Sequence, residues 1–534
     1  MTSTSSTSST AAGSPDSAPA HPGPARGPEH QEETSPAARL PRHQLLSGTV
    51  LLGLSGSLLL TTMAVGAGGI LITDPLITGG PLSWIRYGHG RDLATVGLYL
   101  GVGMLVWAWV RLGRDVLAGV ASARHVLAAS AAWITPMLLS PPLFTRDVYS
   151  YLAQGALALR GLDPYEVGPS ELPPGPVADN VHYVWQTTPA PYGPAFIFLA
   201  KIMSWLTDED AILGVIGMRL ILLAGLGVLV FVLPRLADEL GGKRTVALWL
   251  MVANPMTVIH LVGGPHNDLL MIGLLAAGVL LTLQRRHVAG IALVSAAMAV
   301  KASAGIALPF LVWIWAARLS GSRGIRLLKT GAASLAVFLV VFTGLTMLAG
   351  VGLGWIPALN APSLIVNWMS LPTGAGQLVR FLTSPFHDVS SQPFITVARV
   401  IGSVVFLGIL GRQWWLARDG GPEAVRRGAI VLLCAALLAP ATLPWYLTWG
   451  LVLGAALPWR HRPLAAVVAA STWLVLCTYP TGESGLKSLV YQLATVAVSL
   501  LAAAALLRRD PLRLRATRHP ARTETPEPVP ARTP

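Results

Sequence analysis

Apolar residues along this chain gather in long runs that short polar segments separate. A run of about 20 apolar residues is the length that an α-helix needs to cross the hydrocarbon core of a bilayer. The pattern predicts an all-α polytopic membrane protein. We expect single spanning helices at residues 45–73, 93–112, 122–143, 211–234, 245–262, 268–284, 329–349, 394–415, 463–479 and 488–507.

Two further apolar regions, 288–317 and 427–458, are too long for one ordinary span and have basic residues at both ends. Each contains a break near its middle, a polar one at 301–303 and a Pro-containing one at 440–444. Broken helices are tolerated at membrane depth where they pack in protein or line a cavity. We therefore expect two hairpins of short helices, and about 12 to 14 transmembrane segments in all.

The composition agrees with this pattern, because 53% of the residues are hydrophobic and only 12% are charged. A typical soluble protein is about 25% charged. The net charge of +13 could indicate a nucleic-acid partner or a membrane orientation. With both termini on one side, 28 of the 38 Lys and Arg residues fall on that side and six on the other. The positive-inside rule then predicts cytoplasmic termini, and no nucleic acid is needed to explain the charge.

The chain is expected to have three parts. Residues 1–44 are rich in Ser, Thr, Pro and Ala and should form a disordered cytoplasmic tail. Residues 45–507 should form one transmembrane domain with two long outer loops, 144–210 and 350–393, and residues 508–534 a basic cytoplasmic tail. Long ordered loops over a membrane bundle favour a catalytic or binding surface on the outer side.

The first outer loop opens with the sequence F-T-R-D-V-Y-S-Y-L-A-Q-G. Asp147 follows an apolar span directly, and a carboxylate at the mouth of a bundle suits a general base. If the segment after Asp147 is helical, Tyr151 and Gln154 lie on the same helix face as Asp147. The alternative is that Arg146 and Asp147 form a pair that only anchors the loop. The candidate site residues here are Arg146, Asp147, Tyr149, Tyr151 and Gln154.

Two more segments of this loop, G-L-D-P-Y-E and P-Y-G-P, are candidate sugar platforms. Aromatic rings stack on the apolar face of a sugar while polar groups bind its hydroxyls. The alternative is the aromatic belt that any membrane interface carries. The candidates are Asp163, Tyr165 and Tyr192.

The expected outer turn after 245–262 has the sequence H-L-V-G-G-P-H-N-D, and an Asn-Pro pair at 254–255 should kink the helix before it. Asn267 or Asp268 at the start of the next helix would first of all be an N-cap. A metal site of His260, His266 and Asp268 is weakly specified, since the spacing is not that of a typical zinc site. We therefore predict substrate binding and no metal site for His260, His266, Asn267 and Asp268.

Lys301 is an ionisable residue inside an apolar hairpin, and such residues are costly unless they face a cavity or a partner. At the tip of a broken helix it could hold a lipid phosphate as a point charge. The alternative is a side chain that extends to the interface. Trp445, Tyr446 and Trp449 at the tip of the second hairpin should lie at the same level. Arg219 and Arg399 are lesser phosphate candidates.

Nucleotide-binding and kinase motifs are not evident. Because the outer side of the membrane has no nucleotide pool, a sugar donor there would have to be lipid-linked. The run F-T-R-D-V-Y-S-Y-L-A-Q-G, with G-L-D-P-Y, P-Y-G-P, G-G-P-H-N-D and V-K-A-S-A-G, resembles the actinobacterial polyprenol-phosphate-mannose-dependent α-1,6-mannosyltransferases. These belong to the GT-C superfamily of membrane glycosyltransferases. The resemblance covers roughly residues 45–507.

The resemblance implies a GT-C bundle in the plasma membrane with an extracytoplasmic active site. It implies a polyprenyl-phosphate mannose donor, a mannan or phosphatidylinositol-mannoside-type acceptor, and a role in lipomannan and lipoarabinomannan synthesis. Asp147 matches the position of the catalytic base, and an α product from a β-linked donor implies inversion. In most GT-C members this loop follows the first helix, whereas here it follows the third expected span. No cofactor is expected, and a divalent metal is left open.

Other interpretations stay open at this point. A related GT-C enzyme, either an arabinosyltransferase or a protein O-mannosyltransferase, would share the motifs. A secondary transporter would predict inverted repeats and short outer loops. A structural scaffold would not explain the polar residues gathered in the outer loops.

Overall fold

The computed structural model describes residues 47–72, 80, 83–385, 390–482, 485 and 488–508. Within these residues the chain forms helices and connecting segments, with no extended strand. The all-α prediction is therefore confirmed. The tail expected at 1–44, and all of the tail expected at 508–534 except Arg508, lie outside the described residues.

In the part of the chain that the structure describes, six helices are long and apolar enough to cross a membrane. A seventh span is formed if α9 (Arg244–Met251) and the π-helix η5 (Met256–Gly263), which meet at an angle of 51°, count as one bent segment. These helices confirm a multi-pass membrane protein. The six are α2 (Gly48–Ala67), α3 (Gly88–Leu117), α8 (Ala211–Leu240), α13 (Arg323–Ala349), α16 (Gln392–Leu416) and α20 (Leu489–Leu507).

The other expected spans are shorter helices. By length and composition, six or seven of the expected 12 to 14 segments are complete spans within the described residues. The shorter ones end where a polar or proline-containing segment interrupts the apolar run. They include α4 (Ala123–Ile134) with the 3₁₀ turn η2 (Thr135–Leu139), α10 (Asp268–Leu283) and α19 (His461–Leu476).

Both expected hairpins are present. The first consists of α11 (His287–Val300), η6 (Ala302–Ala307) and α12 (Leu308–Ala316), and Lys301 lies at the break in an extended conformation. The second consists of α17 (Gly421–Leu438), η8 (Pro444–Tyr446) and α18 (Leu447–Gly454), with α17 packed against α18. A lysine and two prolines therefore mark the breaks, as their sequences predict.

The kink expected at the Asn-Pro pair is also confirmed. Asn254 accepts a hydrogen bond from the Met256 N–H at 2.9 Å through its side chain, while its amide donates to the Leu250 carbonyl at 2.9 Å. Pro255 has no N–H to continue the helical ladder. The segment after it turns away from α9 and carries His260 toward the interior of the bundle.

Helices α8, α10 and α11 approach one another closely through glycines. A Cβ on Gly273 of α10 would lie 2.5 Å from the Gly225 carbonyl oxygen of α8. A Cβ on Gly290 of α11 would lie 2.6 Å from the Gly278 carbonyl oxygen of α10. Small residues at such contacts are typical of helix packing in membranes. These contacts fix the first residue of α10 and the last turn of α11 relative to each other.

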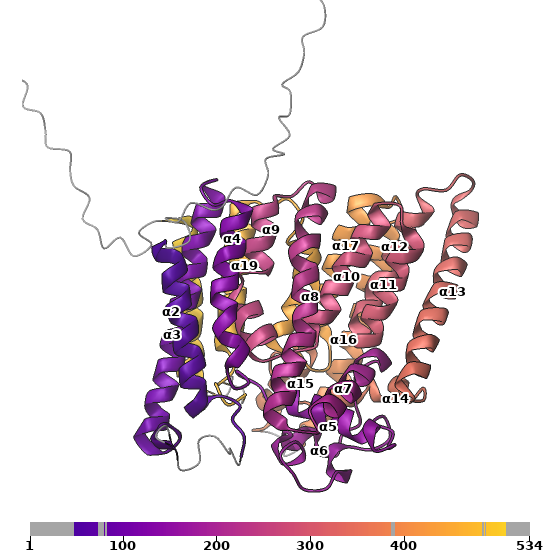
Figure 1. The fold of residues 1–534 in the computed structure, drawn as a ribbon. Helices are drawn as coiled ribbons and strands as arrows, with labels where there is room; N and C mark the ends of the chain where they lie inside the picture. The colour runs from indigo at the N-terminus through magenta and orange to yellow at the C-terminus, as the bar shows by residue number, and fades with distance from the viewer. Residues whose placement is uncertain are drawn as a thin grey trace, which may run out of the picture. The chain divides into compact units, whose positions relative to one another are not determined.

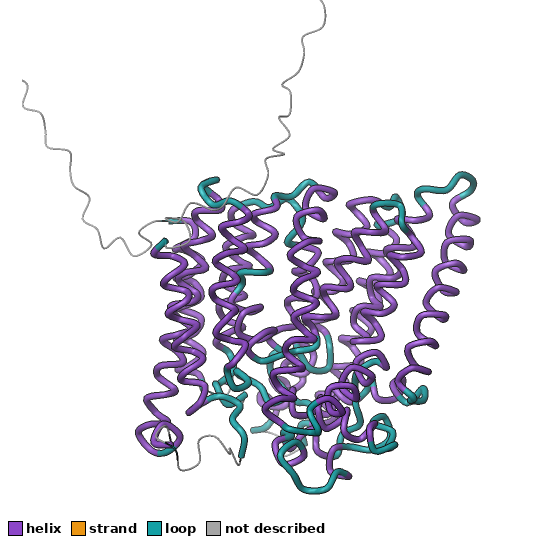
Figure 2. The backbone as a smooth tube through the Cα atoms, in the orientation of Figure 1, coloured by secondary structure: helices purple, strands orange, loops and turns teal. Residues whose placement is uncertain are grey.

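The two long loops are ordered over most of their length and lie at the lower end of the bundle in Figure 1, where Figure 2 also shows the loops concentrated. The first contains α5 (Asp147–Leu159), η3 (Pro169–Glu171), η4 (Ala178–Asn180), α6 (Tyr183–Gln186) and α7 (Pro194–Leu206). The second contains α14 (Trp355–Ala358), η7 (Ala361–Leu364) and α15 (Leu371–Thr383). The apolar helix α7 was not expected, because its run is too short for a span.

The last residues of α2 reach the same end of the bundle. The Ile72 N–H, just after this helix, donates to the Asn180 side chain of the first loop at 2.8 Å. The start of α2 therefore lies about 30 Å away, at the other end of a 20-residue helix.

Candidate active site

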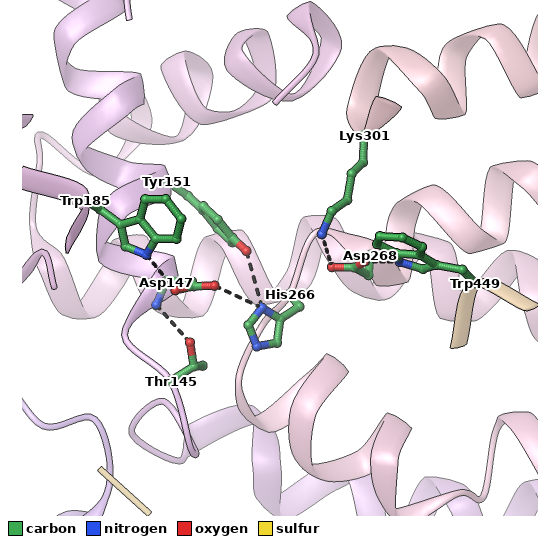
Figure 3. A network of polar contacts seen from close by, with 8 residues as sticks. All are labelled: Thr145, Asp147, Tyr151, Trp185, His266, Asp268, Lys301 and Trp449. Atoms are coloured by element: carbon green, nitrogen blue, oxygen red, sulfur yellow. Dashed lines mark hydrogen bonds and ion pairs between the residues drawn. The ribbon is translucent and has the colours of Figure 1, made fainter. Parts of the chain in front are cut away.

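Asp147 is the first residue of α5, as the sequence predicts. Its N–H donates to the Thr145 hydroxyl at 3.1 Å, and the Trp185 indole N–H donates to its Oδ1 at 3.3 Å. The side chain keeps 15% of its surface exposed. One carboxylate oxygen is therefore held by Trp185, and the other, Oδ2, is directed toward the centre of the site (Figure 3).

His266 lies next to Asp147 and is fully buried. Its Nδ1 is 3.7 Å from Asp147 Oδ2 and 3.4 Å from the Tyr151 hydroxyl oxygen. Its ring stacks on Trp445 with the ring centres 3.5 Å apart. The distance to Asp147 is too long for a hydrogen bond, so Oδ2 remains open to a substrate hydroxyl.

Asp268 begins α10 and forms the second part of the cluster. Lys301 Nζ donates to Asp268 Oδ2 at 2.7 Å, and the Trp449 indole N–H donates to Oδ1 at 2.6 Å. The ammonium of Lys301 also lies 4.9 Å from the centre of the Tyr446 ring. Figure 3 shows this second group beside His266, on the side away from Asp147.

The surroundings of Asp147 change its acidity. Burial raises the pKa of the Asp147 carboxyl above its ordinary value, while the charges of Lys301 and His182 and the hydrogen bond from Trp185 lower it. The net direction is upward. A carboxylate with a raised pKa is a stronger base, which suits proton abstraction near neutral pH.

A cavity of about 420 Å³ opens beside Asp147. Four segments that are far apart in the sequence line it. They are the start and middle of the first loop with Asp147 and Trp185, the second loop around Asn367, the hairpin tip with Trp445, and the segment that contains Thr478. The cavity thus combines a carboxylate with indole faces, which is the combination that a sugar-binding site needs.

The sequence matches family models over most of its length. Residues 50–317 match the family described as "Alpha-(1->6)-mannopyranosyltransferase, N-terminal domain", and residues 372–508 match "MptB C-terminal domain". The Mycobacterium tuberculosis protein named "Alpha-(1->6)-mannopyranosyltransferase A" is 43% identical over 459 residues, covering 85% of this chain and 89% of that protein. The chain belongs to the α-(1→6)-mannopyranosyltransferase family.

Two Corynebacterium glutamicum proteins are similar as well. "Alpha-(1->6)-mannopyranosyltransferase A" is 33% identical over 404 residues, covering 71% of this chain and 82% of that protein. "Alpha-(1->6)-mannopyranosyltransferase B" is 30% identical over 473 residues, covering 81% of this chain and 76% of that protein. The chain is therefore a membrane glycosyltransferase of the mannosyltransferase type, which favours the enzyme interpretation over a transporter or a scaffold.

Three residues close to Asp147 in the sequence form hydrogen bonds that hold the first outer loop in place. Arg146 donates to the Asn180 side chain at 2.8 Å and to its carbonyl at 3.2 Å. The Tyr149 hydroxyl donates to the Gly69 carbonyl at 2.9 Å, and the Gln154 amide reaches the Ser150 hydroxyl at 3.4 Å. Arg146 thus anchors the loop through Asn180 and also lines the cavity, whereas Tyr149 and Gln154 are buried away from it. Substrate contact stays a prediction for Arg146, and the structure gives Tyr149 and Gln154 a supporting position.

The two sugar-platform segments meet behind Tyr151. Asp163 accepts the Tyr165 N–H at 2.9 Å, and the Tyr165 hydroxyl donates to the Tyr192 carbonyl at 2.9 Å. Tyr192 packs edge-on against Tyr151, with ring centres 5.2 Å apart. Asp163, Tyr165 and Tyr192 therefore hold Tyr151 in place and do not line the cavity.

The N-cap expectation for the turn at 260–268 is confirmed in position but not in its side-chain hydrogen bond. Asn267 occupies the N-cap position of α10, but its side chain makes no capping hydrogen bond and is fully buried. Asp268 is bonded to Lys301 and Trp449 instead, and His260 packs against Trp445 with ring centres 5.7 Å apart. Within the described residues, no three His, Cys, Asp or Glu side chains are grouped as metal ligands.

The two intramembrane arginines are not free to bind phosphate. Arg219 donates to the carbonyls of Val262 and Gly263 at 2.9 Å, and to those of Leu138 and Ser140 at 2.8 and 3.0 Å. Arg399 donates to the Thr373 hydroxyl at 2.9 Å and to three backbone carbonyls. Both therefore tie segments of the fold together, and their assignment as phosphate candidates is wrong. Extension of Lys301 to the interface is also wrong, because its ammonium is paired with Asp268.

Sequence reasoning missed two indoles that bind the carboxylates. Trp449 was expected at the level of the hairpin tip but not as a partner of Asp268, although it stands one helical turn after Trp445. Trp185 gave no signal, since a tryptophan in an outer loop is ordinarily part of the aromatic belt.

Proposed function

We propose that this chain transfers mannose from polyprenyl-phosphate mannose to the 6-hydroxyl of an α-1,6-linked mannan acceptor, with inversion at the anomeric carbon. The observation that carries the proposal is the open Oδ2 of Asp147 beside an indole-lined cavity. The names of the relatives support mannose and the α-(1→6) linkage. The acceptor class would be the mannan of lipomannan and lipoarabinomannan, or a phosphatidylinositol-mannoside precursor.

In this mechanism Asp147 is the general base. As the acceptor O6 attacks the anomeric carbon, its proton passes to Asp147 Oδ2. The bond between the anomeric carbon and the donor phosphate oxygen breaks, and polyprenyl phosphate leaves with the electron pair. A phosphate monoester is a good leaving group, so no acid catalyst is required. Trp185 holds Oδ1 and thereby fixes the direction of Oδ2.

Lys301 would stabilise the charge that develops on the departing phosphate. Its ammonium has three N–H donors, and Asp268 takes one of them. The aromatic rings of Tyr446 and Trp449 lie 4.9 and 5.6 Å from it and leave it little freedom. A preorganised cation in a water-poor site gives strong electrostatic stabilisation. Asp268 would therefore act on Lys301 as a positioning residue.

The proposal also includes an orientation. Cytoplasmic termini and an extracytoplasmic site follow from the excess of Lys and Arg on the side of the termini. An outer site has no nucleotide-sugar pool, which supports a lipid-linked donor. The polyprenyl chain would remain in the bilayer beside the bundle.

Transfer in membranes that contain the full chain tests the proposal. Labelled polyprenyl-phosphate mannose should give an α-1,6-linked product on a short α-1,6-mannoside, and the matching arabinose donor should give none. The same mannoside with a 6-deoxy residue at its non-reducing end should accept nothing. Transfer from the arabinose donor alone, or undiminished transfer to the 6-deoxy acceptor, would reject the proposed donor or the proposed hydroxyl.

A further inference from the structure

A polar pocket lies at the end of the bundle where α2 begins and α20 ends. Its volume is about 800 Å³. The cationic side chains that line it are Arg111 and Arg114 from α3 and Arg508 after α20, and His461 at the start of α19 also faces it. Among the described residues, Asp115 is the one acidic residue of its lining. Three arginines against one aspartate give the pocket a net positive charge.

An apolar groove lies next to this pocket, along the preceding turns of α3 and α20. Its volume is about 570 Å³, and its lining includes Val106, Trp107, Leu501 and Ala505. The guanidinium of Arg114 lies 5.2 Å from the centre of the Trp107 ring. The same side chain donates through Nε to the Ala505 carbonyl at 2.6 Å. Arg114 thus stands at the junction of the polar pocket and the apolar groove.

This junction is separate from the candidate active site. The 12-residue helix α4, about 18 Å long, leads from the end of the bundle that holds the pocket toward the segment before Asp147. None of the residues that line the pocket or the groove lines the cavity beside Asp147. A ligand here would therefore bind without contacting the reacting groups.

The chemistry of the two cavities selects an amphipathic anion. The apolar groove alone would accept the acyl chain of any lipid, because its lining carries few polar atoms. The arginines at its end favour a phosphate without a compensating cation, since guanidinium groups bind phosphate oxygens in pairs. Basic pockets between transmembrane helices are known to bind anionic head groups. A zwitterionic lipid would bring its own positive charge into a pocket that is already cationic.

We propose that the pocket and the groove together bind one anionic phospholipid, with its phosphate at Arg111, Arg114 and Arg508 and one acyl chain along α3 and α20. The lipid comes from the leaflet at the end of the bundle where α2 begins. It lies between α3 and α20, with Thr49 of α2 beside its head group. This site is independent of the proposed function, because a binding measurement tests it without any transfer reaction.

Native mass spectrometry of the purified full chain tests the head-group site. The protein is incubated with equal amounts of phosphatidylglycerol and phosphatidylcholine that have the same acyl chains. The wild type should retain phosphatidylglycerol preferentially. Arg111→Ala combined with Arg508→Ala should lower this preference on the order of tenfold, because each arginine near a lipid phosphate contributes substantially. Arg114 is left unchanged, since it also holds the Ala505 carbonyl.

A charge-matched control is Lys329→Ala combined with Arg412→Ala, two exposed basic residues of α13 and α16 outside the pocket. This control should keep the wild-type preference. Equal retention of the two lipids by the wild type, or an equal loss in the control and the test variant, would overturn the proposal.

The groove is tested by filling it. A Cβ on Gly103 meets no atom within 4 Å, so Gly103→Leu adds a side chain to the groove without a clash at its first carbon. Gly408→Leu on α16 is the matched control, because Gly408 also has open space around it and lies outside the groove. Gly103→Leu should reduce phosphatidylglycerol retention several-fold and Gly408→Leu should not. Full retention in Gly103→Leu would overturn the proposal that one lipid occupies both cavities.

Discussion

Two helices of the active site, α5 and α10, each begin with an aspartate, and the two carboxylates have different surroundings. Asp147 keeps 15% of its side-chain surface exposed and lines a cavity, and Trp185 donates one hydrogen bond of 3.3 Å to its side chain. Asp268 is fully buried, and its two oxygens are bonded to Lys301 at 2.7 Å and to Trp449 at 2.6 Å.

Because their surroundings differ, the carboxylates of Asp147 and Asp268 are suited to different roles. A base needs an oxygen that a substrate can reach and a carboxylate that is not over-stabilised, and Asp147 meets both conditions. A carboxylate with both oxygens satisfied and a cation beside it is a poor base but fixes that cation in place. Asp147 is therefore suited to proton transfer, and Asp268 to holding Lys301.

The largest expected effect is on transfer by Asp147→Asn. Removal of a general base should reduce mannose transfer by about 100- to 10,000-fold. Burial raises the pKa of the Asp147 carboxyl, so its ionisation lowers the free energy of unfolding near neutral pH. The neutral amide of Asp147→Asn does not carry this cost, so the variant should not lose thermal stability. Asp179→Asn, an exposed carboxylate of the same loop, is the control and should keep wild-type activity. Wild-type turnover by Asp147→Asn would show that Asp147 is not the general base.

Asp268→Asn should act on stability, in contrast to Asp147→Asn. It leaves the buried ammonium of Lys301 without its counter-charge, which should cost about 3 kcal/mol of unfolding free energy. Thermal unfolding in detergent measures this. Asp238→Asn breaks the exposed pair with Arg244 and should cost less than about 1 kcal/mol. Equal losses in the two variants would show that Asp268 and Lys301 are not a coupled buried pair.

Lys301→Gln should lower kcat/KM for the lipid-linked donor by about 10- to 100-fold, because a hydrogen bond to a charged group contributes about 1.5 to 3 kcal/mol. The double variant Lys301→Gln with Asp268→Asn removes both charges together. If Lys301 contacts the phosphate, kcat/KM of the double variant stays low, although its stability recovers. Recovery of kcat/KM would show that Lys301 serves only to neutralise Asp268.

Trp185→Phe should have the smallest effect, less than about tenfold near neutral pH. Loss of the indole donor raises the pKa of Asp147 further, because that hydrogen bond stabilises the carboxylate. The acid limb of the profile of kcat/KM against pH should therefore move to higher pH. Trp205→Phe, at an exposed tryptophan of α7, is the control. An acid limb at the same pH as in the wild type would show that Trp185 does not affect the pKa of Asp147.

Local features of this fold were predictable from the sequence, because single residues cause them. Pro255 and the prolines at 440 and 444 interrupt helices for reasons that do not depend on distant contacts. Asp147 was placed correctly at the start of a helix after an apolar run. The length of each apolar run was less informative, because buried helices such as α10 are apolar without being long enough to span.

The partners of the site residues were not predictable, since they come from distant segments. Trp185 lies 38 positions from Asp147, and Trp449 lies 181 positions from Asp268. A phosphate contact was plausible for Arg219 from its place in an apolar run, but backbone carbonyls of distant segments accept its N–H groups instead. Close helix contacts such as Gly225 with Gly273 determine these distances, and no local pattern encodes them.

The most direct test of Asp147 as a base replaces the acceptor hydroxyl by azide. Azide carries no proton, so its attack on the anomeric carbon of polyprenyl-phosphate mannose needs no base. Asp147→Asn should fail with a mannoside acceptor and still form α-mannosyl azide at a rate close to that of the wild type. If Asp147→Asn forms no azide product while the wild type does, Asp147 is needed for donor binding and the central claim is wrong.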